Sequence, residues 1–383
     1  MADLERRFPS IALMEATARR RIPRFAWDYM AGGIGRESVL AENCARLDRV
    51  KLRPRYLVDD AESPQLSQTL LGVDYALPFA VAPLGLSGLI WPAAAEHLAR
   101  AARARKIPFT LSNVATSSIE QIGNIGGHIW YQHYATTDTD VNADLLGRAQ
   151  ASGFSTLVIT VDIPTATRRQ RDMRNGLSVP PAFSVRTLFD ILGRPAWALA
   201  TLQQGVPEFL NLKPYLPAGL SLAQLGVHLA QLLEGHVSQQ KLAWYRAHWP
   251  GRLIVKGILD PADALACRDI GADAIVVSNH GGRQLDAAQT AVDALPAIRS
   301  ATGPDFPLLA DGGIRSGLDI ARYLALGADF VLPGRAFMFA LGAIGARGPE
   351  HAMHVLQAEL RSTLGQLGCP SLAQLPEFLI RAE

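Results

Sequence analysis

Short apolar runs rich in β-branched residues recur along the chain and alternate with amphipathic segments of helical period. Each run is nearly continuous, as strands buried on both faces are. We predict eight strands, at residues 78–82, 108–111, 129–134, 156–161, 253–256, 274–278, 307–310 and 330–333. Eight strands that alternate with helices predict an α/β fold, a parallel (β/α)8 barrel, with a doubly wound sheet as the alternative.

Two segments depart from this repeat. Residues 1–75 precede the first strand and are predicted to form two helices and a connector, a helical cap across one end of the barrel. The fourth and fifth strands lie about 90 residues apart, and we place an insertion at residues 176–240, on the side where barrel enzymes build their sites. Because no linker separates domains, residues 1–383 are predicted to form one domain, with the barrel at 76–383.

The composition narrows the class of protein. With 49% hydrophobic and 19% charged residues, the chain is globular with a large core. Its 37 basic and 35 acidic residues, without a run of five like charges, exclude nucleic acid as a partner. No apolar stretch reaches the roughly 18 residues of a spanning helix, and charges at positions 3–7 argue against a signal peptide. We therefore expect a cytoplasmic protein, and its three cysteines predict neither a disulfide nor a metal site.

The strongest chemical signal is the run from Ser278 to Asp286, Ser-Asn-His-Gly-Gly-Arg-Gln-Leu-Asp, at the end of the sixth predicted strand. Imidazole titrates near neutrality, so His280 is a candidate base. Two glycines let the chain turn tightly after it, and the guanidinium of Arg283 can hold a carboxylate through two hydrogen bonds. A base beside a carboxylate clamp suits a small organic acid as substrate. The alternative is a loop histidine beside a surface arginine.

Two glycine-containing loops, after the seventh and eighth strands, predict a phosphate site. Their glycines expose backbone N–H groups and their arginines supply positive charge. The residues are Asp311, Gly312, Gly313 and Arg315 in the first loop and Gly334 and Arg335 in the second. The phosphate could belong to a substrate, to a nucleotide or to flavin mononucleotide (FMN).

Two further strand ends carry ionisable side chains. Lys256 ends the fifth strand, where its ammonium could stabilise negative charge on a cofactor ring or form a Schiff base. The alternative is a lysine that extends to the solvated rim. Asp162 ends the fourth strand, and its carboxylate could orient His280.

Arginines and tyrosines nearby are further candidates. Arg168, Arg169 and Arg171 follow the fourth strand, and one of them could face the substrate, although a solvated turn explains the cluster as well. Tyr29 and Tyr134 are candidate hydroxyl donors, although their pattern alone favours packing roles.

Together these motifs resemble the family of FMN-dependent 2-hydroxy acid dehydrogenases and oxidases, from about residue 8 to residue 380. The resemblance implies a (β/α)8 barrel that oxidises an L-2-hydroxy acid to the 2-oxo acid and reduces bound FMN. Residues 82–88 and 162–167 resemble the lactate and mandelate dehydrogenase branch. That branch passes electrons to a quinone or another acceptor. The alternative within the family is an oxidase that uses oxygen and releases hydrogen peroxide.

The resemblance also implies catalytic and substrate-binding roles. His280 resembles the catalytic base, and Asp162 resembles the carboxylate that pairs with it. Arg169 and Arg283 resemble the arginines that bind the substrate carboxylate.

Tyr29 and Tyr134 match two active-site tyrosines, the second of them grouped with the catalytic residues. Lys256 matches a lysine near flavin N1 and O2. The other implied FMN contacts are Ala82, Pro83, Leu84, Gly85, Ser112, Gln132, Thr160, Ser278, Asp311, Gly312, Gly313, Arg315, Gly334 and Arg335.

Three positions depart from the oxidase pattern or from the family pattern. Val114 stands where oxidases carry a tryptophan, so we expect a wider substrate pocket, and Gly85 stands where they carry an alanine. His133 replaces an apolar residue before the second tyrosine, and the sequence offers no reason for it.

Residues 180–216 are unusually apolar for part of an insertion. They hold five charged residues and five aromatic ones: Phe183, Phe189, Trp197, Phe209 and Tyr215. We expect this segment to contact the barrel rim, a neighbouring subunit or a membrane interface. The resemblance favours peripheral association with the inner membrane and a homotetramer.

Overall fold

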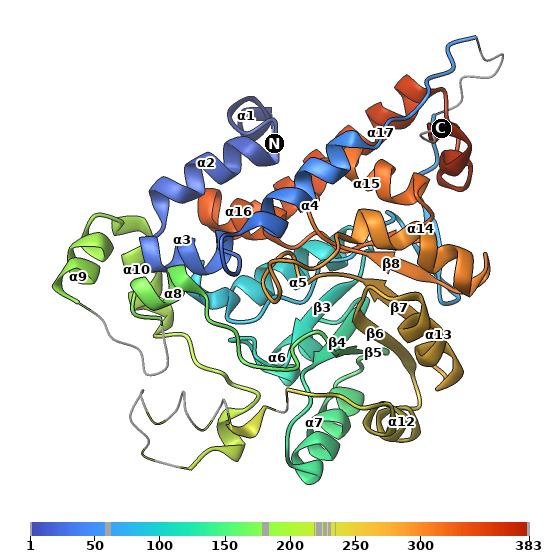
Figure 1. Cartoon of the computed structure of the whole chain (residues 1–383). Helices are drawn as coiled ribbons and strands as arrows, with labels where there is room; N and C mark the ends of the chain where they lie inside the picture. Colours follow the sequence, from blue (N-terminus) through green and yellow to red (C-terminus); the bar gives the residue numbers. More distant parts are fainter. Residues whose placement is uncertain are drawn as a thin grey trace.

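Seven parallel strands, hydrogen-bonded in the order of the chain, curve through the centre of the molecule (Figure 1). The computed structural model describes residues 2–57, 63–177, 184–217, 219, 224, 228, 231–233 and 235–380. Each strand overlaps a predicted one. The strands are β3 (Phe109–Ser112), β4 (Ile129–His133), β5 (Thr156–Thr160), β6 (Arg252–Ile258), β7 (Ala274–Val277), β8 (Leu308–Ala310) and β9 (Phe330–Val331).

The remaining predicted strand, residues 78–82, closes the ring through single parallel bridges. Phe79 pairs with Val331 of β9, and Val81 pairs with Phe109 of β3. Backbone hydrogen bonds of 2.9 to 3.2 Å accompany both bridges. The sheet is therefore a closed barrel, which confirms the predicted α/β barrel fold.

Alternate residues of each strand point into the barrel, and their chemistry changes from one end to the other. A short antiparallel hairpin, β1 (Gln68–Leu70) and β2 (Val73–Tyr75), packs on the apolar end. The buried side chains there include Leu70, Tyr75, Trp130, Val158, Ile254, Ala274 and Phe330. The inward positions at the carboxyl ends are polar, namely Ser112, Gln132, Thr160, Lys256, Ser278 and Asp311.

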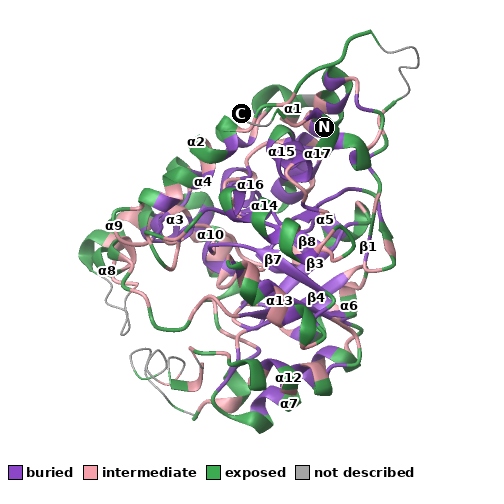
Figure 2. Cartoon of the chain, turned by 45° about the vertical axis from the view of Figure 1, so that its right-hand side comes forward, coloured by how far each residue is buried: buried purple, intermediate pink, exposed green. Residues whose placement is uncertain are grey.

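Helices surround this sheet, and several begin at a residue whose side chain accepts backbone N–H groups of the first turn. Ser118, Asp138 and Thr290 are examples of such N-caps. The surrounding helices are α5 (Ala94–Ala104), α6 (Ile119–Ile125), α7 (Thr139–Ala151), α12 (Gln239–His248), α13 (Pro261–Asp269), α14 (Ala291–Thr302), α15 (Gly317–Ala325), α16 (Arg335–Ile344) and α17 (Gly348–Leu367). Their inner faces and the strands are buried, as Figure 2 shows.

The N-terminal segment differs from the prediction of two helices and a connector. It forms four helices, α1 (Ala2–Arg7), α2 (Ile11–Arg21), α3 (Arg24–Ala31) and α4 (Ser38–Arg49), followed by the β1–β2 hairpin. Helix α2 packs against α16, and the end of α3 reaches the carboxyl ends of the strands. The segment therefore covers both ends of the barrel, with helices at one end and the hairpin at the other.

The segment after β5 carries α8 (Gln170–Arg174), just before the predicted insertion, and then α9 (Val185–Leu192) and α10 (Pro195–Gln204) within it, and these helices lie beside α3 (Figure 1). The indole of Trp197 packs edge-on against Phe25 of α3, with ring centroids 5.7 Å apart, and its N–H donates to Leu89 O at 3.1 Å. Phe183 lies outside the described residues. Among the described residues, no helix combines the length and the apolar character needed to cross a membrane.

Candidate active site

A cavity of about 690 Å³ opens at the carboxyl ends of the strands, within the size range of cofactor and ligand sites. Most residues that the sequence singled out line it, from Tyr29 of α3 to Arg335 of α16. Four predicted residues stand behind the lining instead: Ser112, Gln132, Asp162 and Ser278. The structure therefore gathers residues from nearly the whole chain around one cavity.

His280 and Asp162 form a partly exposed pair at the cavity wall. His280 Nδ1 lies 2.8 Å from Asp162 Oδ1, so the carboxylate accepts from Nδ1–H and leaves Nε2 as the acceptor nitrogen. Burial lowers the pKa of His280, although Asp162 opposes that effect. Burial would raise the pKa of Asp162, but His280 and Lys256 outweigh it and hold that pKa below its usual value. The pair is therefore a neutral imidazole oriented by an ionised carboxylate.

The backbone conformations of His280 and Gly257 allow the imidazole and the carboxylate to meet. His280 has φ +56°, a left-handed conformation that few non-glycine residues adopt. Gly257, at φ +108°, lies against Asp162, and a Cβ there would come within 2.5 Å of the Asp162 Cβ. Glycine at position 257 is therefore required for the carboxylate to reach His280.

Arg283 extends over the cavity as its place in the motif predicted. Its Nη1 donates to Tyr29 O at 2.7 Å and to Gly32 O at 3.0 Å, both at the carboxyl end of α3. Burial lowers its pKa to about 10, with a further contribution from Arg169. Two arginines near one another in a buried cavity favour an anion between them.

The two tyrosines contact different members of this group. Tyr29 donates its hydroxyl hydrogen to Gly85 O at 3.3 Å, and its ring lies under Arg283. The ring of Tyr134 lies nearly parallel to the imidazole of His280, with centroids 6.5 Å apart. Both tyrosines line the cavity, but the Tyr29 hydroxyl is already bonded to Gly85 O.

Lys256 ends β6 as a buried cation with defined partners. Its Nζ lies 3.0 Å from Asp311 Oδ2 and donates to Ser278 Oγ at 2.8 Å. Burial would lower the pKa of Lys256, but Asp311 and Asp162 raise it above its usual value. The ammonium is therefore charged, which disfavours the Schiff-base alternative and favours charge stabilisation.

The predicted phosphate loops meet at the far end of the cavity. Arg335 is half-buried at the N-terminus of α16, where its guanidinium donates to Met30 O, Gly281 O and Gly32 O at 2.9 to 3.1 Å. Burial lowers its pKa well below the usual value, and no carboxylate pairs with it among the described residues. A cation without an anion, at a helix N-terminus, is suited to a phosphate group.

Unpartnered polar atoms near the cavity support a flavin as its occupant. Gln132 Oε1 and Asp311 Oδ1 are buried without a hydrogen-bond partner within the described part of the chain. Gln132 Nε2 donates to Thr160 Oγ1 at 3.0 Å, and the amide oxygen is left without a partner. Buried polar atoms of this kind require a hydrogen-bond partner, and the polar edge of a flavin ring system would supply one. Together with Arg335 and Arg315, they fit FMN.

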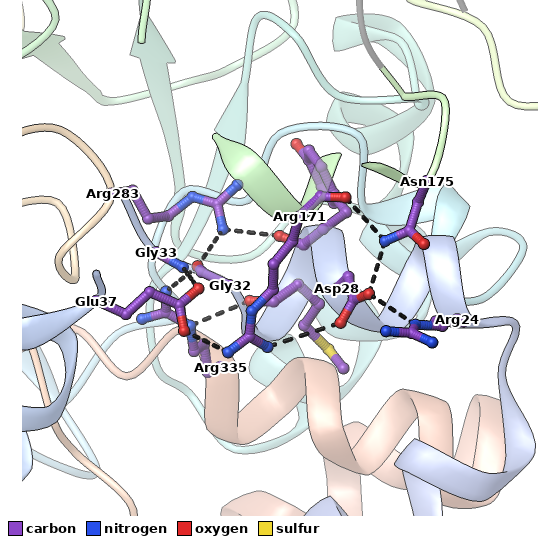
Figure 3. A network of polar contacts seen from close by, with 11 residues as sticks. Arg24, Asp28, Gly32, Gly33, Glu37, Arg171, Asn175, Arg283 and Arg335 are labelled. Carbon is purple, nitrogen blue, oxygen red and sulfur yellow. Dashed lines mark hydrogen bonds and ion pairs between the residues drawn. The ribbon is translucent and has the colours of Figure 1, made fainter. Parts of the chain in front are cut away.

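The arginine cluster after β5 divides between two roles. Arg169 lines the cavity at the N-terminus of α8, whereas Arg168 does not line it. Arg171 turns away and contacts Glu37, and its Nη1 lies 3.6 Å from Asp28 Oδ1 (Figure 3). This network joins α8 to α3 and to the loop after it.

Several lining residues have no counterpart in the sequence prediction. Met30 and Met338 reach the cavity from α3 and α16, and Leu233 and Gly235 reach it from the insertion. Met30 directly follows Tyr29 in the sequence, but no local motif marks it as a residue of the cavity. Leu233 enters because Thr136 pairs with it in an antiparallel bridge, a contact between residues far apart in the chain.

Comparisons with known proteins agree with this geometry. The model of the family described as FMN-dependent dehydrogenase matches residues 18–382. An L-lactate dehydrogenase of Caulobacter vibrioides is 42% identical over 365 residues, which cover 95% of each chain. An L-lactate dehydrogenase of Pseudomonas syringae pv. syringae is 41% identical, over 95% of this chain and 96% of the relative.

Solved structures agree as well. A structure described as the monotopic membrane protein (S)-mandelate dehydrogenase superposes with a TM-score of 0.92 at 33% identity, covering 97% of this chain and 99% of that chain. A structure of mandelate oxidase superposes with a TM-score of 0.82 at 34% identity, covering 97% and 98%.

Proposed function

The chain belongs to the FMN-dependent dehydrogenase family, and we propose that its cavity oxidises an L-2-hydroxy acid, of the size of lactate or mandelate, to the 2-oxo acid. The observation that carries this proposal is the His280–Asp162 pair in the same buried cavity as Arg283 and Arg169. A base and two carboxylate-binding cations are what a 2-hydroxy acid requires.

The two arginines bind and orient the substrate. Arg283, already held by Tyr29 O and Gly32 O, presents the rest of its planar fork to the carboxylate. Arg169 adds a second positive charge, and its Nη1 lies 3.8 Å from Asp172 Oδ2. Tyr134 lines the same cavity, and its hydroxyl group donates to the bound acid, whereas the Tyr29 hydroxyl would first have to release Gly85 O.

His280 removes a proton from the substrate at Nε2. Its Nδ1 is bonded to Asp162, and the ionised carboxylate stabilises the imidazolium that forms. Bound FMN supplies the acceptor for the two electrons. The residues that would hold it are the glycines and arginines of the two phosphate loops, together with Gln132, Thr160 and Lys256, and the Lys256 ammonium would offset negative charge on it.

Anaerobic bleaching of the flavin tests this proposal. The purified enzyme is mixed with the two enantiomers of lactate and mandelate, with glycolate and with longer 2-hydroxy acids. We expect the L-acids to abolish the oxidised flavin absorbance and the D-acids to leave it unchanged. A bound flavin that none of these acids reduces would contradict the proposed reaction.

We further propose that the electrons leave to a membrane quinone, because α9 and α10 carry an apolar surface that no other described element covers. Val185, Leu188, Phe189 and Leu192 follow helical spacing along one face of α9, and Phe189 is 67% exposed. Leu199 and Leu202 on α10, and Val206 just after it, are exposed as well. Arg186 and Arg194 flank it, as expected for contact with anionic lipid. We place the enzyme on the cytoplasmic face of the inner membrane.

Vesicle sedimentation tests this membrane surface. The variant Leu188→Ser, Phe189→Ser, Leu192→Ser should no longer sediment with vesicles of phosphatidylethanolamine and phosphatidylglycerol, while the hydroxy acid still reduces its flavin. The matched control Leu57→Ser, Ile380→Ser removes exposed apolar side chains elsewhere and should sediment as the unaltered enzyme does. If the α9 variant stays on vesicles and instead dissociates into smaller species, the surface is a subunit contact.

The acceptor and the assembly need separate measurements. Rapid reoxidation of the reduced enzyme by a soluble quinone analogue supports the dehydrogenase, whereas oxygen consumption with release of hydrogen peroxide supports the oxidase alternative.

We propose a homotetramer on the family resemblance. Light scattering coupled to size-exclusion chromatography gives its mass directly.

A further inference from the structure

Two asparagines hold the backbone that follows β4. Tyr134 N–H donates to Asn113 Oδ1 at 3.2 Å, and Asn113 Nδ2 donates to Tyr134 O at 2.9 Å. Two residues later, Thr136 N–H donates to Asn142 Oδ1 at 2.9 Å, and Asn142 Nδ2 donates to Thr136 O at 3.0 Å. Each amide therefore binds both polar backbone groups of one residue. We call this arrangement of Asn113 and Asn142 the paired clamp.

His133 lies between the two amides and is fully buried. Its Nε2 is 2.8 Å from Asn142 Oδ1, and its Nδ1 is 3.4 Å from Asn113 Nδ2. The backbone contacts fix each amide, so an oxygen faces Nε2 and an N–H faces Nδ1. The neutral imidazole with hydrogen on Nε2 satisfies both neighbours. A second ring hydrogen would point at the N–H of Asn113.

The clamp is also joined to the wall of the cavity. The Tyr245 hydroxyl donates to Asn142 Oδ1 at 3.0 Å, and Lys241 Nζ donates to Thr136 O at 3.2 Å, both from α12. On its other side Thr136 pairs with Leu233, which lines the cavity. The paired clamp thus connects β3, β4, α7 and α12 at the point where the chain enters the candidate active site.

Successive residues of a strand point to opposite sides, so His133 faces the helices while Tyr134 faces the cavity. The direction of the Tyr134 ring, parallel to His280, depends on the backbone that Asn113 holds. We propose that His133 is a positioning residue, which fixes Tyr134 relative to His280 through the paired clamp. This inference rests on the proposed function of Tyr134 as a hydroxyl donor to the substrate.

Flavin reduction by the hydroxy acid, measured in stopped flow with His133→Leu, tests the inference. Leucine fills similar space but leaves Asn113 Nδ2 and Asn142 Oδ1 each one partner short. We expect the reduction rate or the substrate affinity to fall about 10-fold to 100-fold, because misplacement by about 1 Å has such effects. His133→Asn keeps an oxygen facing Asn113 and should recover most of the loss. Unchanged kinetics for His133→Leu would overturn the inference.

A matched variant separates positioning from loss of stability. His351 is another buried histidine, on α17, with a bond of 2.8 Å between its Nε2 and Phe8 O. His351→Leu should lower the melting temperature and leave the kinetics of flavin reduction unchanged. If both leucine variants slow flavin reduction equally, His133 has only a structural role. If His133→Leu does not fold, His133→Asn carries the test, and kinetics of that variant as poor as those of Tyr134→Phe overturn the inference.

A double-mutant cycle with Tyr134→Phe distinguishes this inference from the proposed function. If His133 acts through Tyr134, His133→Leu should cost little in the Tyr134→Phe background. If the effects of the two single changes on the rate of flavin reduction multiply fully in the double variant, the two residues act independently, which would contradict the inference. If Tyr134→Phe alone reduces the flavin normally, the proposed role of Tyr134 is wrong, whatever the behaviour of His133.

Discussion

The two ends of the barrel interior are built on the same strands and the same alternation, yet they have opposite chemistry. At the hairpin end, Trp130 and Phe330 pack around Tyr75 with ring centroids 6.3 and 5.5 Å away. Two residues further along β4 and β6, the inward positions hold Gln132 and Lys256, with polar partners. The hairpin end therefore stabilises the fold by burying apolar side chains. The polar end holds charges whose burial costs free energy, and the apolar end must offset that cost.

This contrast predicts that variants at the two ends fail in different ways. Those at the polar end should lose rate or affinity with little change in stability. Those at the apolar end should lose stability and keep the kinetics of the folded fraction.

The largest effect is expected for His280→Gln at the polar end. Without the base, flavin reduction by the hydroxy acid should slow by about 10²–10⁴-fold, while FMN stays bound. Stopped-flow absorbance measures the rate, and the flavin spectrum of the purified variant confirms the loading. A rate within a factor of a few of the unaltered enzyme would remove His280 from the role of base.

Phe330→Ala is the corresponding change at the apolar end. Phe330 is completely buried, and its loss should cost about 3–5 kcal/mol in the free energy of unfolding. Denaturant unfolding measures this loss. The reduction rate of the folded fraction should not change. A slower reduction at full flavin occupancy would show that the two ends are coupled.

His133 lies outside the barrel interior and should affect stability through pH. Burial lowers its pKa to about 4, against about 6.5 in an unfolded chain, so the unfolded state binds a proton more readily. The stabilisation from the neutral ring is present above about pH 6.5 and is lost as pH falls to about 4, a change of about 3 kcal/mol. Comparing the unfolding free energy of the unaltered enzyme and His133→Leu across this window measures it. Parallel pH curves would contradict a buried neutral ring.

Arg283→Lys should have the smallest effect of these four changes, although still a clear one. A lysine keeps the charge but cannot present a planar fork to a carboxylate while it also holds Tyr29 O and Gly32 O. We expect affinity for the hydroxy acid to fall about tenfold or more, a cost of about 1.4 kcal/mol. The substrate dependence of flavin reduction measures it, and the binding of FMN should be unaffected.

The sequence predicted the polar end well because strand alternation and loop motifs are local signals. Lys256 could be placed in the site from a strand end alone, and His280 and Arg283 from one motif, whereas Thr160 was implied only by the family resemblance. The pairing of His280 with Asp162, given by the family resemblance, is present at 2.8 Å.

What the sequence did not predict depends on contacts between distant segments. The strands β1 and β2 have three residues each, too few for a periodic pattern, so the hairpin was hidden in the predicted cap. Leu233, in the insertion, lines the cavity because it pairs with Thr136, which follows β4 and is far from it in the sequence. His133 had no explanation until Asn113 and Asn142 were seen on either side of its ring.

The carbonyl of Gly32 is shared by two arginines with different tasks. It accepts from Arg283 Nη1 at 3.0 Å and from Arg335 Nη2 at 2.9 Å, so the proposed substrate arginine and the arginine at the phosphate loops share the two lone pairs of one oxygen (Figure 3). An anion that draws Arg335 toward itself leaves that oxygen more fully to Arg283. We therefore expect occupancy at one site to change the free energy of binding at the other, and thermodynamic linkage would require the same coupling in the reverse direction. A 2-oxo acid should accordingly bind with different affinities to the enzyme with and without its cofactor, and cofactor retention should depend on the acid present.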